Sequence, residues 1–111
     1  LGVRGAAYLL GLLDAVGEIK RRVYDTIRKG RGEEAASLFT LMEQIYTHIY
    51  PYAIYDRIAP GLKRKLDVAR ILIEDTRSTV TEEARRMRFM KAVEELSKKL
   101  SSTSRKRRGE P

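Results

Sequence analysis

Apolar residues recur along this chain at the three- and four-residue spacing of an α-helix, and this periodicity limits the fold more than any other feature. One face of the first segment carries Leu12, Val16, Ile19, Val23 and Ile27. Alternation of polar and apolar residues, the mark of a half-buried strand, never persists. The periodicity therefore predicts an all-α fold, an antiparallel helical bundle.

Glycine and proline divide the first half of the chain into two helices. The first is predicted over residues 6–29, and Gly30 follows it as a C-terminal stop. The second is predicted from about 33 to 50. Residues 51–60 hold two prolines and are predicted to form a connection.

The second half predicts two more helices and a tail. The apolar period continues over residues 62–77. Thr79 precedes Glu82 by three residues, a capping-box pattern that predicts the start of a fourth helix. The segment 101–111 is rich in Ser and basic residues and is predicted to be disordered. Residues 1–100 are thus expected to form the helical domain.

The composition excludes several kinds of site. A chain of 111 residues is one domain in length, and without cysteine it can hold neither a disulfide nor a zinc-thiolate site. No apolar run approaches the roughly 20 residues of a membrane span, and no secretory signal is visible. We therefore expect a cytoplasmic protein with no membrane partner. The absence of Asn and the single Gln favour a thermophilic source.

The net charge of +8 favours a polyanionic partner. Residues 56–111 hold 16 basic and 9 acidic side chains, whereas residues 1–55 hold 7 and 6. Phosphate contacts would supply affinity that does not depend on sequence. The alternative is that each basic cluster is a solvated helix face. The candidate nucleic-acid-binding residues are Lys20, Arg21, Arg22, Lys63, Arg64 and Lys65.

Two carboxylates on the first helix form a candidate metal site. Asp14 and Glu18 are four residues apart and share one helical face. Mg²⁺ prefers carboxylate oxygen and often needs only one or two carboxylates together with substrate phosphate. The alternative is that Glu18 pairs with Arg22 and Asp14 is simply solvated. His48 is the sole histidine, so a cluster of histidine ligands is excluded within one chain.

Four tyrosines lie within ten residues, 46–55. Their rings offer stacking surfaces for single-stranded bases. The alternative is that they close a helix end and cover a helix–helix or subunit seam.

Three segments give the chain a resemblance to a known family. Residues 8–21 read YLLGLLDAVGEIKR, residues 39–46 read FTLMEQIY, and residues 61–70 read GLKRKLDVAR. With the Gly30–Gly32 turn between the first two, this pattern resembles the translin family. It is most similar to the branch of translin-associated factor X and the archaeal translin-like proteins.

The resemblance implies an all-helical subunit of a closed homo-oligomer, typically an octamer, that binds single-stranded RNA or DNA. The factor X branch is associated with Mg²⁺-dependent endoribonuclease activity. Asp14 matches a metal-site Asp of that branch, and Glu18 matches a neighbouring acidic position. The remaining Glu residues of the family site belong to an earlier helix that this chain does not include, so the match covers the C-terminal half of the family fold.

Three functions follow as alternatives. The first is a single-stranded RNA- or DNA-binding subunit of a translin-like oligomer. The second is a Mg²⁺-dependent endoribonuclease in which Asp14 and Glu18 are catalytic metal ligands. The third is a structural helical oligomer whose charge serves only solubility.

Overall fold

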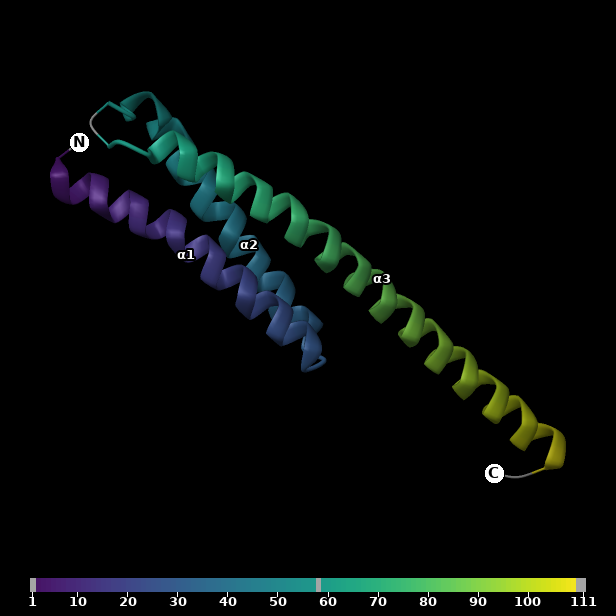
Figure 1. Cartoon of the computed structure of the whole chain (residues 1–111). Coiled ribbons are helices and arrows are strands. Elements are labelled where there is room, and N and C mark those ends of the chain that lie inside the picture. Colours follow the sequence, from purple (N-terminus) through teal and green to yellow (C-terminus); the bar gives the residue numbers. More distant parts are fainter. Residues whose placement is uncertain (1, 58, 110–111) are drawn as a thin grey trace.

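The computed structural model describes residues 2–57 and 59–109, and its elements are all helical (Figure 1). The all-α prediction is confirmed for these residues. Three long helices replace the four that were expected, and a short 3₁₀ segment follows the second. The elements are α1 (Val3–Arg28), α2 (Gly32–Ile49), η1 (Tyr50–Tyr55) and α3 (Leu62–Arg108).

The helices form an elongated bundle in which α3 is far longer than its partners. α1 and α2 make an antiparallel hairpin, and α3 runs in the same direction as α1 but continues well past the α1–α2 turn (Figure 1). At 47 residues α3 has a length of about 70 Å, close to the 77 Å long axis of the molecule, whose other two axes are 18 Å. None of the described helices is long and apolar enough to span a membrane.

The α1–α2 turn is fixed by Gly30, as the sequence predicts. Gly30 has φ of +76°, a left-handed conformation that costs glycine little. Its N–H donates to the Ile27 carbonyl at 2.9 Å, and the Arg31 N–H donates to the Thr26 carbonyl at 3.0 Å. This pair of bonds is the Schellman arrangement, which satisfies carbonyls left free at a helix end.

The core is a narrow column shared by the three helices. Val16, Val23, Met42 and Leu62 have no exposed surface. Thr76 is also fully buried, and its hydroxyl donates to the Leu72 carbonyl at 2.7 Å, so no unpaired polar group enters the column. Of the face predicted for the first helix, Val16, Ile19 and Val23 are buried, whereas Leu12 and Ile27 are half-buried.

The predicted break between a third and a fourth helix is wrong. α3 is continuous, and Thr79 lies inside it with its hydroxyl 3.0 Å from the Tyr24 hydroxyl of α1. The physical reason is that no Gly or Pro occurs between residues 62 and 108. A capping-box pattern satisfies amides at a helix start but does not by itself end the preceding helix.

The structure also differs from the expected disorder after Ser101, because α3 continues through Arg108. Lys and Arg are good helix formers, and four of them in the last turn face the negative end of the helix dipole. The helix ends at Gly109, which has φ of +74° and donates its N–H to the Lys106 carbonyl at 3.1 Å. The helix thus ends at the first glycine after residue 61.

Adjacent residues of α2 provide a matched test of this core. Met42 is fully buried, whereas Leu41 is 43% exposed. We expect Met42→Ala to lower the free energy of unfolding by about 2–5 kcal/mol because it leaves a cavity between three helices. Leu41→Ala should lower the free energy of unfolding by less than about 1 kcal/mol. Urea denaturation followed by circular dichroism measures both; equal costs would contradict the assigned core.

Candidate nucleic-acid interface

Polar side chains link α1 to α3 at three levels of the bundle. Asp14 of α1 forms an ion pair with Lys65 of α3. One and a half turns further along α1, the Lys20 ammonium lies 2.6 Å from the Asp75 carboxylate. The Tyr24–Thr79 hydroxyl contact completes the series. These contacts fix the register of the two parallel helices, so several sequence-predicted site residues act in the structure as links between helices.

A groove runs beside this seam at the level of Asp14. It has a volume of about 400 Å³. Gly17 and Gly61 contribute no side chains to it, and Arg64 and Lys65 supply its positive charge. Arg64 has no carboxylate within ion-pair distance in the described part of the chain. The groove therefore offers one unneutralised guanidinium to an anionic group.

Each of the two candidate metal ligands lies beside a basic side chain in this arrangement. The Asp14 carboxylate contacts the Lys65 ammonium, and a Glu18 carboxylate oxygen lies 3.6 Å from the Arg21 guanidinium. These surface ion pairs leave the Mg²⁺ site a prediction, because Mg²⁺ often needs only one or two carboxylates together with substrate phosphate. Across residues 2–57 and 59–109, no three Asp, Glu or His side chains gather closely enough to hold a metal ion. The predicted Glu18–Arg22 pair is replaced by Glu18–Arg21.

The six predicted nucleic-acid-binding residues divide into two groups. Those already paired with a carboxylate are Lys20, Arg21 and Lys65. Within the described residues, the side chains without an acidic partner are Arg22, Lys63 and Arg64. Paired cations have part of their charge neutralised, so the second group is the better source of phosphate contacts.

The tyrosines gather at the end of the bundle where α3 begins. Tyr46 and Tyr50 have ring centroids 5.7 Å apart, and Tyr52 and Tyr55 have centroids 6.2 Å apart. The rings of η1 are exposed rather than buried at a seam within the chain. Nearby, His48 is exposed, with Nδ1 2.8 Å from the Gln44 carbonyl oxygen, an ordinary helix-surface position.

Asp56 ties this aromatic end to the first turn of α3. Its carboxylate accepts the Lys63 backbone N–H at 3.0 Å, which satisfies one of the free amides at the helix start. The side chains of Lys63 and Arg64 remain exposed on the same turn. Exposed rings and unpaired cations therefore lie at one end of the molecule.

One charged element is longer than the sequence predicts, because the basic segment 101–111 was expected to be disordered. Residues 89–108 of α3, here called the overhang, hold seven basic and two acidic side chains. The uninterrupted run from 62 to 108 without Gly or Pro was the signal that would have revealed it.

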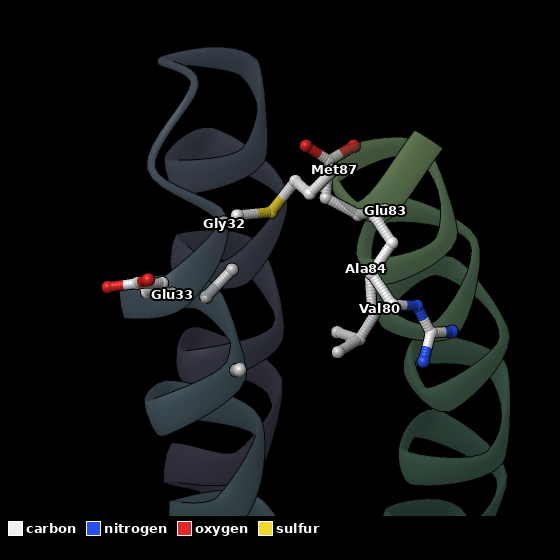
Figure 2. Close-up of a pocket in the computed structure, with 9 residues that line it drawn as sticks. Gly32, Glu33, Val80, Glu83, Ala84 and Met87 are labelled. Carbon is white, nitrogen blue, oxygen red and sulfur yellow. The ribbon is translucent and has the colours of Figure 1, made fainter. Parts of the chain in front are cut away.

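A second hollow lies between the start of α2 and the middle of α3 (Figure 2). It has a volume of about 240 Å³ and an almost entirely apolar lining. Met87 reaches across from α3 to Gly32, where an added Cβ would collide with the Met87 Sδ (Figure 2). Glycine at this position therefore lets Met87 close the end of the hollow.

Glu83 borders this hollow in a charged pair with Arg86. The guanidinium donates to both carboxylate oxygens, at 2.7 and 3.0 Å. These hydrogen bonds, assisted by the positive charge of Arg86, lower the pKa of the Glu83 carboxyl from its ordinary value. Glu83 is thus held as an anion beside an apolar surface.

Comparison with known proteins gives one distant relative. The chain is 30% identical over 73 residues to an uncharacterised protein, MJ0175, of Methanocaldococcus jannaschii. The match covers 66% of this chain but 32% of that protein, so it spans about a third of the relative's length. No protein-family model and no solved structure matches the chain. The translin resemblance therefore stays a prediction.

The Glu83–Arg86 pair predicts an acid-sensitive contribution to stability. Because folding lowers the pKa of Glu83, the contribution is present above the unfolded-state pKa and is lost as pH falls through the folded value. Glu83→Gln should lower the melting temperature at pH 7 and have little effect at an acid pH below the folded-state pKa. The control is Glu74→Gln, which removes a more exposed carboxylate paired with Arg70. An equal loss at both pH values would contradict this role.

Proposed function

We propose that the chain is a single-stranded nucleic-acid-binding subunit of the translin type. The observation that supports this most directly is the meeting of exposed tyrosine rings and unpaired basic side chains where η1 joins α3. Neither feature alone distinguishes nucleic acid from other partners. Together they provide both parts of a single-strand site, a stacking surface for bases and cations for the phosphates.

The two ring pairs suit unpaired bases better than a duplex. Bases of a single strand expose their faces, and each base stacked on an aromatic ring contributes about 1–3 kcal/mol. Tyr50, Tyr52 and Tyr55 are 59%, 41% and 39% exposed, so their surfaces are accessible without rearrangement of the bundle. Stacking accepts every base, so the proposed binding has little sequence preference.

Charge supports the same function. The groove beside Asp14 continues from this end along the α1–α3 seam, with Arg64 in its wall. Cations that replace the counterions of a strand give an affinity that falls steeply with salt. The excess of basic residues after residue 56 agrees with such a contribution.

Replacing both unpaired cations of the α3 start tests the location of the site. Lys63→Ala together with Arg64→Ala should weaken binding of unrelated single-stranded RNAs alike and reduce the slope of log affinity against log salt by up to about 1.4. The matched control is Lys98→Ala with Lys99→Ala, which removes the same charge from the overhang. Fluorescence anisotropy at several salt concentrations measures both. If the control weakens binding as much as the Lys63 and Arg64 replacements, then affinity depends on net charge and not on contacts at the start of α3.

Removing one ring tests the stacking surface. We expect Tyr52→Ala to weaken single-stranded RNA binding by about 1–3 kcal/mol and to leave the salt slope unchanged, because a ring contributes no phosphate contact. Tyr52→Phe, which keeps the ring and removes only the hydroxyl, should leave affinity nearly unchanged. Equal losses in the two variants would contradict a stacking role for η1.

A further inference from the structure

The overhang, residues 89–108, lies beyond the α1–α2 turn and packs against nothing in the described chain (Figure 1). Its length is roughly 30 Å. Every residue in it is exposed except half-buried Ser104. A helix of this length is marginal in water on its own propensity, so an apolar stripe along it indicates a contact surface.

Such a stripe is present. Its members follow the four–three–four spacing of a coiled-coil seam: Phe89, Val93, Leu96 and Leu100. They are 67%, 44%, 57% and 61% exposed. The buried face of α3 is marked by Leu66 and Ile73, and at 100° per residue the stripe lies about half a turn away from it. α1 and α2 therefore cannot cover the stripe.

We propose that the stripe binds a second copy of this chain, with the two overhangs packed antiparallel. The four stripe residues are spaced symmetrically about a point between residues 94 and 95, so two antiparallel copies can align their stripes. In that register Phe89 meets Leu100 of the second copy, and Val93 meets Leu96 of the second copy. Each apolar side chain thus finds one on the opposing helix, as seams of this kind require.

The charges select the antiparallel direction. The same register places Arg107 opposite Glu82 of the second copy, and both residues lie on the stripe face of α3. A parallel pair would instead bring the two basic ends, residues 105–108, side by side. Like charges placed side by side repel. The antiparallel pair instead places each basic end beside Glu82 and Glu83 of the other copy, where Arg107 would share the Glu82 carboxylate with Arg85.

The bundle leaves room for this arrangement. The end of the second copy would lie along α3 at residues 81–86, on the face turned away from α1 and α2. Glu82 lies on that face with its side chain 69% exposed. The association uses no residue of the tyrosine end, so it is independent of nucleic-acid binding and is measured without nucleic acid.

A matched pair of variants tests the apolar contact. Leu96 and Ile71 lie on the same face of α3 and are 57% and 58% exposed, but Ile71 is beyond the reach of the second copy. Light scattering and sedimentation equilibrium of the full chain should show association of 12.7 kDa subunits. Leu96→Arg should weaken self-association at least tenfold, and Ile71→Arg should not. A monomeric wild type, or equal effects of the two variants, would overturn the proposal.

A charge exchange tests the register. Glu82→Arg and Arg107→Glu should each weaken self-association, since each places like charges opposite one another. An equal mixture of the two variants should associate as well as the wild type, because both opposing pairs then have opposite signs. No recovery in the mixture would reject this register. If the chain stays monomeric and the stripe is protected from hydrogen exchange only by anionic lipid vesicles, a membrane surface is the occupant and the proposal fails.

Discussion

The contact among three apolar helix faces governs the rest of the structure. Val16, Met42 and Leu62 come from three different helices and have no surface exposed to water. Burial of this kind is the dominant stabilising term in a small domain. Because each helix contributes a single face to it, the opposite faces are left for polar links, for the seam groove and for partners.

Helix length then decides which surfaces are available. The α1–α2 hairpin ends at Gly30, while α3 meets no glycine until residue 109. The difference in length between α3 and the α1–α2 hairpin separates two regions with different physical properties. The bundle end carries aromatic rings, a capped helix start and a groove, whereas the far end carries an unpaired apolar stripe surrounded by positive charge.

Periodicity predicted the helical class and the central buried positions of α1, which are Val16, Ile19 and Val23, while glycine predicted the turn at Gly30. It failed where a local pattern was given more weight than the continuity of the chain. Thr79 and Glu82 resemble a helix start, but with neither Gly nor Pro between them and Leu66 the backbone has no reason to leave the helix. The ion pair between Asp14 and Lys65 was beyond the reach of sequence, since the two residues are 51 apart and only packing of α1 on α3 brings them together.

The unequal helix lengths also grade the stability of α3 from one end to the other. Side chains of α1 and α2 pack against its first half. Its last twenty residues are held in the helix by their own backbone hydrogen bonds. Local unfolding should therefore become easier turn by turn toward Gly109. A partner that binds the overhang must contribute enough binding free energy to offset the backbone entropy lost when these residues become helical. Binding at the overhang is therefore coupled to the helix–coil equilibrium of α3.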